Sequence, residues 1–203
     1  MFAVVESGSI TSMPKGNKGI VVGDNQYPAS IFTLWTEAER NAVGVYTVEI
    51  DNTNRKDQEW YQNTAITYAY DSSANKVKGT YGTATAKNID DITWTQTEID
   101  DGDAPDGATT STVKQEGLKT IHKKIIDDQC KDILAPSDWM VVRATETDTT
   151  MDSGWKTWRA SVRTKCNSMQ SQIDGASDVD ALAALFIRNE SGVRPLGDFP
   201  VKE

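Results

Sequence analysis

The stretch ILAPSDWMVVRATET, residues 133–147, separates two long helical patterns and decides how they meet. Pro136 has no backbone N–H and disfavours helical angles in the residue before it, so the preceding helix is predicted to end near Leu134. The stretch could form either the rim of a pocket or a structural corner. Its residue types favour the corner.

The residues that follow the proline support that interpretation. Ser137 or Asp138 can cap a brief turn, and such a turn directs Trp139 back between the two helices as a wedge. A buried tryptophan at this place would make Trp139→Ala cost about 3–5 kcal/mol.

The two sides of the corner carry helical periodicity. One helix is predicted over residues 114–134 and a second over 155–174, with Gly175 as its stop. Ser177 with Asp180 is predicted to cap a third, shorter helix. The predicted buried stripes are Leu118, Ile121, Ile125 and Ile133 in the first helix, and Trp158, Val162, Met169 and Ile173 in the second. Residues 113–190 are therefore predicted to form a helical hairpin or three-helix unit, followed by a tail over 191–203.

The first 92 residues are instead patterned as strands. Three β-branched runs, FAVVE, IVVG and VYTVEI, are punctuated by glycines. Thr36 and Glu39 have the spacing of a capping box and predict one short helix. Ile66, Tyr68 and Tyr70 share one face of a strand in a predicted hairpin. The fold class expected for the chain is therefore α+β, with a small antiparallel sheet preceding the helices.

Residues 93–112, rich in Thr, Asp and Gly, separate these two regions and show little periodicity. We expect a linker or long surface loop. The aspartates at 101, 103 and 106 suggest a calcium loop, but Pro105 occupies the third ligand position and Thr112 stands where the bidentate glutamate is needed. A solvated acidic turn is the favoured interpretation.

Charge and hydropathy narrow the function classes. The 203-residue chain has 21 basic and 30 acidic residues, a net charge of −9, so we expect no nucleic-acid partner. Its longest apolar runs fall short of the roughly 20 residues of a spanning helix, which predicts no membrane segment. The N-terminus has no secretory pattern, and we expect the chain to remain in the cytoplasm in which it is made.

Residues suited to catalysis are few. The single histidine, His122, lies one position off the predicted apolar stripe, and triad chemistry needs such a base. Cys130 and Cys166 belong to no metal-ligand cluster; we interpret both as semi-buried thiols, with a disulfide between the two helices as the alternative. We therefore expect no enzyme activity, no catalytic residue, no cofactor and no metal.

Aromatic residues are the unusual feature. Six tryptophans and six tyrosines exceed what a small core requires in so polar a chain, and large amphipathic rings favour interfaces. The candidate interaction residues are Trp60, Tyr61 and Trp94.

Two stretches, LAPSDWMVVRATETD and WKTWRASVRTKCNSMQSQIDGASDVDALAAL, together resemble a family. They are similar to the C-terminal helical segment of small tail-associated proteins of tailed bacteriophages, including proteins related to tail-fibre assembly proteins. The matching positions are Pro136, Asp138, Trp139, Arg143, Glu146, Trp155, Trp158 and Arg159. The N-terminal stretches MFAVVESGSI, YPASIFTLWTEAERNAVGVYTVEIDNT and TYGTATAK look like those of proteins carried by phages of marine bacteria. The chain departs from the pattern at its end, PLGDFPVKE, where tail-fibre assembly proteins often have a Trp-Pro-rich tail.

The resemblance implies a phage setting: a non-enzymatic structural protein of the tail or tail fibres, found in the virion and made in the host cytoplasm. Its expected partners are other phage structural proteins, fibre or baseplate subunits among them, and further copies of itself in a homo-oligomer. Two alternatives stay open. One is a tail-fibre assembly chaperone absent from the mature virion. The other is a carbohydrate-binding host-attachment module that uses Trp60, Tyr61, Tyr68 and Tyr70.

Overall fold

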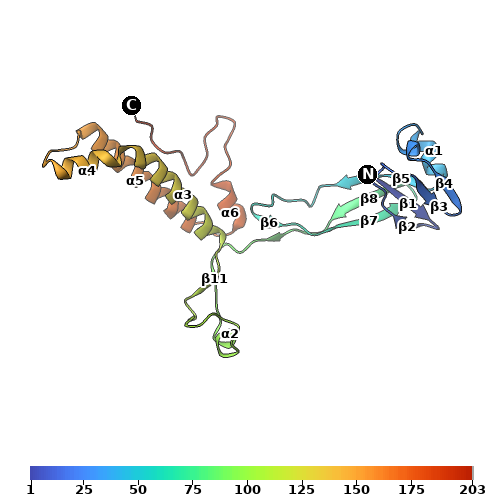
Figure 1. Cartoon of the computed structure of the whole chain (residues 1–203), viewed down its shortest axis with the longest axis horizontal. Helices are drawn as coiled ribbons and strands as arrows, with labels where there is room; N and C mark the ends of the chain where they lie inside the picture. Colours follow the sequence, from blue (N-terminus) through green and yellow to red (C-terminus); the bar gives the residue numbers. More distant parts are fainter. Residues whose placement is uncertain (203) are drawn as a thin grey trace. The chain divides into compact units, whose positions relative to one another are not determined.

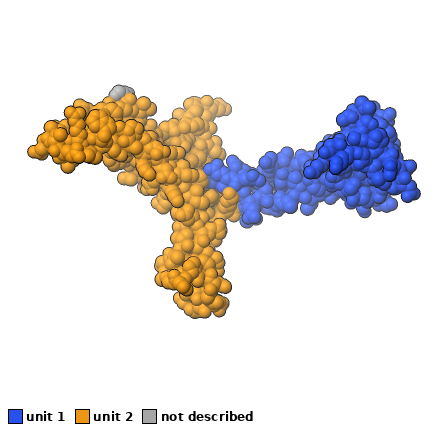
Figure 2. All heavy atoms as spheres, in the orientation of Figure 1, with its two compact units in different colours: residues 1–85 blue, residues 86–203 orange. Residues whose placement is uncertain are grey.

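The computed structural model describes residues 1–202 and divides the chain into two compact units, one ending at Thr85 and one beginning at Ala86 (Figure 2). The expected α+β fold class is confirmed: strands dominate the first unit and helices the second (Figure 1). We had expected the strand-rich region to extend to residue 92.

The first unit is built on a five-stranded sheet in the order β2-β1-β5-β8-β7. Its strands are β1 (Phe2–Glu6), β2 (Ser9–Ser12), β5 (Val45–Asp51), β7 (Ile66–Asp71) and β8 (Lys76–Tyr81). Smaller elements are β3 (Ile20–Val22) paired with β4 (Asn25–Tyr27), β6 (Tyr61–Gln62) paired with β9 (Thr85–Ala86), the 3-10 helix η1 (Ala29–Phe32) and α1 (Glu37–Ala42).

One pair of the sheet is parallel, whereas we had expected an antiparallel sheet. β5 and β8 run in the same direction, with Val48 opposite Val77. The predicted hairpin of β7 and β8 is present, but β7 takes the outer edge of the sheet. The chain has then reversed twice since β5, and β8 returns beside β5 in the same direction.

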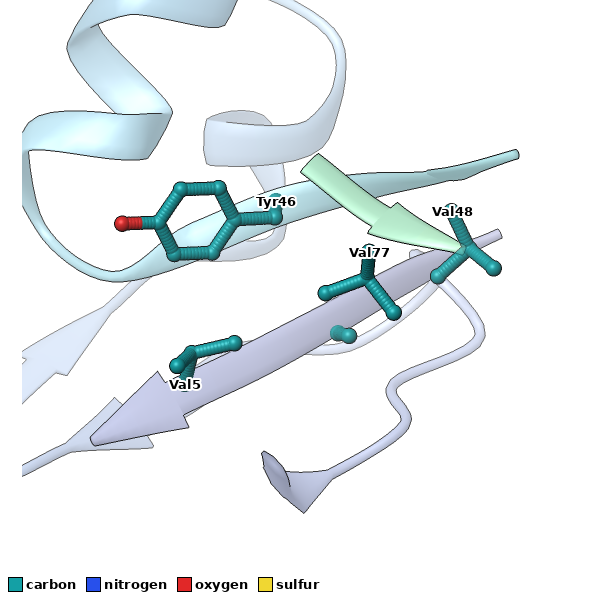
Figure 3. Close-up of a cluster of buried hydrophobic side chains, with 5 residues drawn as sticks. Val5, Tyr46, Val48 and Val77 are labelled. Carbon is teal, nitrogen blue, oxygen red and sulfur yellow. The ribbon is translucent and has the colours of Figure 1, made fainter. Parts of the chain in front are cut away.

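Strand alternation gives this sheet two apolar faces. Side chains of successive residues point to opposite faces, so Tyr46 joins Val5, Val48 and Val77 in one cluster (Figure 3). Val45 lies on the other face in a second cluster with Ile31 and Phe32. The predicted capping box opens α1: the Thr36 backbone N–H donates to the Glu39 carboxylate at 2.8 Å, and the Glu39 N–H donates to the Thr36 hydroxyl at 3.3 Å.

The second unit contains the helices α3 (Leu118–Leu134), α4 (Asp138–Glu146), α5 (Ser153–Asp174) and α6 (Val179–Ala184), with the 3-10 turn η2 (Ala135–Ser137) between α3 and α4. α3 and α5 pack against each other as the predicted hairpin (Figure 1). The buried residues are Leu118, His122, Ile126, Cys130 and Leu134 in α3, and Arg159, Val162, Cys166, Met169 and Ile173 in α5.

The stripe predicted for α3 was wrong in part. Ile121 and Ile125 are 39% and 43% exposed, while His122 is buried. The buried positions of α3 recur every four residues, and two of them are histidine and cysteine, which a count of aliphatic residues passes over. In α5 the prediction holds for three of its four residues, and Trp158 is half-buried.

Other helix boundaries and caps also differ from the prediction, and α5 begins at Ser153 instead of residue 155. α3 begins at Leu118 because residues 113–115 form a strand. α6 is capped by Asp178, whose carboxylate accepts from the Ala181 N–H at 2.8 Å. The brief turn expected after Pro136 is the nine-residue helix α4.

Residues 93–112, predicted to be a linker or long surface loop, contain regular secondary structure. β10 (Ile92–Thr93) pairs with β11 (Val113–Gln115), and α2 (Gln96–Asp100) lies between them. Thr95 and Glu98 form a capping box that opens α2. That spacing is visible in the sequence, but the surrounding Asp- and Gly-rich composition obscured it. We call residues 92–115 the acidic arm (Figure 1).

Candidate interaction surface

Arg159 is the residue that holds the corner. Its side chain is 4% exposed, and its guanidinium donates to the Leu134 carbonyl oxygen at 2.8 Å, to the Ser137 hydroxyl, and to the Asp138 carboxylate at 2.5 Å. The Ser137 hydroxyl in turn donates to the Leu134 carbonyl at 2.8 Å. The last carbonyls of a helix need donors from outside it, and Arg159 of α5 supplies one to the last residue of α3. The same side chain also holds Ser137 and Asp138, where α4 begins.

Trp139 is not the predicted wedge. Its side chain is 55% exposed, and none of the nine residues of α4 is buried. Once the chain continues as a helix after Asp138, Trp139 lies on an exposed face of α4 and is not inserted between α3 and α5. It shares that face with Val142, which is three residues further on and also exposed. The role expected of Trp139 is carried by Arg159.

A groove lies between α4 and α5. A hollow of about 470 Å³ is lined by apolar residues of α4 and the following loop, and by cations of α5. We call it the α4–α5 groove; its lining is Val141, Ala144, Thr145, Thr149, Thr150, Met151, Lys156, Arg159 and Arg163. A second hollow of about 350 Å³ shares Ala144 and Met151 and is bordered by Trp139 and Trp155.

The cations of the groove differ in their partners. Arg159 is paired with Asp138. Lys156 and Arg163 are exposed, and within residues 1–202 neither side chain has a hydrogen-bonding or ion-pair partner. The groove thus combines an apolar floor with two available positive charges. This arrangement suits a partner that has carboxylates beside small apolar groups.

The other two corner tryptophans pack within the unit. Trp155 and Trp158 make an edge-to-face contact with ring centroids 5.5 Å apart, and the Trp158 indole N–H donates to the Pro200 carbonyl at 3.0 Å. Leu196 of the same tail is fully buried, and the Lys165 ammonium donates to its carbonyl at 2.8 Å. These contacts fasten the C-terminal tail to α5.

The prediction that Trp60 is an exposed interaction residue was wrong, because its side chain is only 7% exposed. Tyr61 beside it is half-buried, and the Lys56 ammonium lies 4.1 Å from its ring centroid. Tyr68 and Tyr70 pack against the buried cluster of the sheet, and the Tyr70 hydroxyl donates to that of Tyr46 at 3.1 Å. These rings do not form the open aromatic platform expected of a carbohydrate-binding face.

Trp94 is half-buried inside the acidic arm. The Lys114 ammonium lies 4.6 Å from its ring centroid and also pairs with Glu98. The hydrogen bond from Lys114, with others from Thr95, lowers the pKa of Glu98 to about 2. Trp94 therefore contributes to the internal packing of the arm, across its two strands and helix.

The groups suited to catalysis are enclosed by packing. His122 is buried, with its ring 4.7 Å from that of Phe186. Cys130 and Cys166 are both buried and form no disulfide. Burial, and then hydrogen bonding with Cys130, raises the pKa of the Cys166 thiol to about 12. Within residues 1–202 no group of three or more His, Cys, Asp or Glu side chains could hold a metal, and no helix there is long and apolar enough to cross a membrane.

Comparison with known proteins gives no relative: no family model matches the chain, and no curated protein or solved structure matches it either.

Proposed function

We propose that this protein is a non-enzymatic structural protein of a tailed phage, located in the tail or tail fibres of the virion and acting through protein–protein contacts. The observation that carries the contact role is α4, a helix with no buried residue that exposes Trp139, Val141 and Val142. Covering large apolar side chains is favourable by about 1.5–3 kcal/mol each. A neighbouring subunit placed over α4 would therefore gain binding energy there.

The phage setting is supported by the residues that resemble tail-associated proteins. Asp138 and Arg159 of that pattern meet in an ion pair at the corner, and Trp155 and Trp158 contact each other on α5. These positions of the pattern form one structural feature, from which α4 projects its exposed tryptophan.

The non-enzymatic part of the proposal rests on the surroundings of the reactive side chains. His122 lies in the interior of the helical unit against Phe186, and a general base must be within hydrogen-bond reach of a substrate proton. The Cys166 thiol has a raised pKa, which opposes formation of the nucleophilic thiolate.

Mass spectrometry of purified virions tests the proposal. The expected result is that the protein is present in mature particles of the phage that encodes it, at a ratio comparable with known tail proteins. A phage carrying Val142→Ser and Trp139→Ser should incorporate less of it, whereas Lys124→Ser, on the exposed surface of α3, serves as the matched control.

Presence in the infected cell but absence from mature particles would overturn the virion assignment. That outcome would support the assembly chaperone, because the exposed face of α4 also suits transient binding to a folding fibre. For carbohydrate attachment the buried Trp60 and the packed Tyr70 supply no comparable surface.

A further inference from the structure

The acidic arm presents carboxylates that the chain itself leaves unpaired. Glu98 is held by Lys114, and Asp100 accepts from the Gln96 amide at 2.8 Å. Beyond them the tip reads DGDAPD, residues 101–106. Its three aspartates are exposed, and their side chains have no hydrogen-bonding or ion-pair partner in the described part of the chain. The tip therefore carries three available negative charges around Ala104 and Pro105.

The α4–α5 groove has the complementary character. Lys156 and Arg163 supply unpaired positive charges, and Val141, Ala144 and Met151 supply apolar surface. Charges of opposite sign that have no internal partner favour association and select its orientation. The small apolar residues of the tip, Ala104 and Pro105, suit a floor of this size.

The arm cannot use the groove of its own chain. Its base is fastened to the first turn of α3: the Gly117 N–H donates to the Asp91 carboxylate at 2.7 Å, and Lys119 pairs with Asp90 at 3.0 Å. Gly117 is required there, because a Cβ would lie 2.3 Å from the Asp90 carbonyl carbon. The groove is lined in part by α4, and Figure 1 shows α4 beyond the other end of α3. α3 has 17 residues and is therefore about 25 Å long.

We propose that the tip of the acidic arm, residues 101–106, docks in the α4–α5 groove of a second copy of this chain. Asp101 and Asp103 meet Lys156 and Arg163, while Pro105 lies against the apolar floor. Because the two surfaces differ, each copy offers one tip and one groove. Such head-to-tail contacts generate a ring when the rotation closes and an open filament when it does not. This inference goes beyond the proposed function and does not depend on a phage origin.

Sedimentation velocity of the purified full-length protein over a concentration series tests the contact. The wild type is expected to form concentration-dependent oligomers. One variant reverses the charges of the groove with Lys156→Glu and Arg163→Glu, and another reverses those of the tip with Asp101→Lys and Asp103→Lys. Each should weaken association at least about tenfold, because like charges then face each other. An equimolar mixture of the two variants should restore oligomers, since each reversed surface then finds a complementary one.

Matched controls keep the result specific. Lys124→Glu with Lys131→Glu makes the same charge change on the exposed surface of α3, and Asp128→Lys with Asp132→Lys matches the tip variant. Both should associate like the wild type, and circular dichroism checks that every variant is folded.

Three outcomes would overturn the proposal. One is a wild type that stays monomeric up to about 1 mM, which corresponds to a negligible contact. Another is a pair of reversed variants that associate as the wild type does, and the last is a mixture that fails to recover. A monomeric wild type that binds a different acidic protein through Lys156 and Arg163 would assign the groove to that partner. None of these results bears on virion content, so the failure of one proposal leaves the other standing.

Discussion

α4 and α5 lie on either side of one short loop, yet only α5 is part of the core. α5 buries residues along its length, from Arg159 to Ile173, because α3 faces it throughout. α4 buries none, although it begins with an aspartate and a tryptophan beside a proline. The difference shows that an aromatic residue at a corner is buried only where a second element lies opposite it. Within the described residues no element covers the exposed face of α4 that carries Trp139 and Val142, and we propose that a partner covers it.

The largest loss of stability expected from this comparison follows a substitution in the centre of α5. Met169→Ala removes a fully buried side chain and should lower the free energy of unfolding by about 3–4 kcal/mol, since large-to-small changes leave a cavity. Chemical denaturation followed by circular dichroism measures it. Met140→Ala in α4, where the side chain is half-buried, is the matched control and should cost less than about 1 kcal/mol. Equal costs would show that the two helices are buried alike.

A somewhat smaller effect is expected where the two helices are joined. Arg159→Leu removes the buried hydrogen bonds that the guanidinium donates to the Leu134 carbonyl and the Ser137 hydroxyl, and it should cost about 2–3 kcal/mol because hydrogen bonds to a charged group contribute about 1.5–3 kcal/mol each. Arg163→Leu, one turn further along α5 but exposed, should change the free energy of unfolding by less than about 0.5 kcal/mol. If both changes had the same small effect, Arg159 would not be what holds the corner.

The smallest loss of stability is expected at Trp139, the tryptophan of the corner. Trp139→Ala should lower the free energy of unfolding by less than about 1 kcal/mol, because the ring is more than half exposed. The same denaturant titration measures it. A loss of 3–5 kcal/mol, the value for a buried wedge, would contradict the exposed position of Trp139 and restore the interpretation made from the sequence.

Local signals predicted much of the fold. The β-branched runs at β1 and β5 form paired strands, and the capping box at Thr36 and the hairpin of β7 and β8 are present. The stop after Asp174 is present too, since α5 ends where Gly175 follows. Each of these depends on residues a few positions apart. The capping box at Thr95 was equally local and could have revealed α2.

The candidate surface was less predictable. Trp94 and Trp60 were predicted to be exposed, but the Lys114 ammonium lies against the ring of Trp94, and the Trp60 side chain is buried. Nothing near Arg159 in the sequence indicates that its partners are 21 to 25 residues earlier in the chain. The groove was also not predictable from neighbouring residues, because its apolar floor and its cations come from different helices.

The sequence by itself determined the α+β class, the places where most helices and strands occur, and the end of α3 at Leu134, although Ala135 before the proline keeps helical angles. Those properties follow from backbone angles and side-chain periodicity, which act over a single turn or strand. Only the tertiary structure decided that His122 faces the core, that β8 lies parallel to β5, and that Arg159 instead of Trp139 fills the corner. Burial depends on which distant segment lies opposite a residue, and that is a property of the whole packed unit.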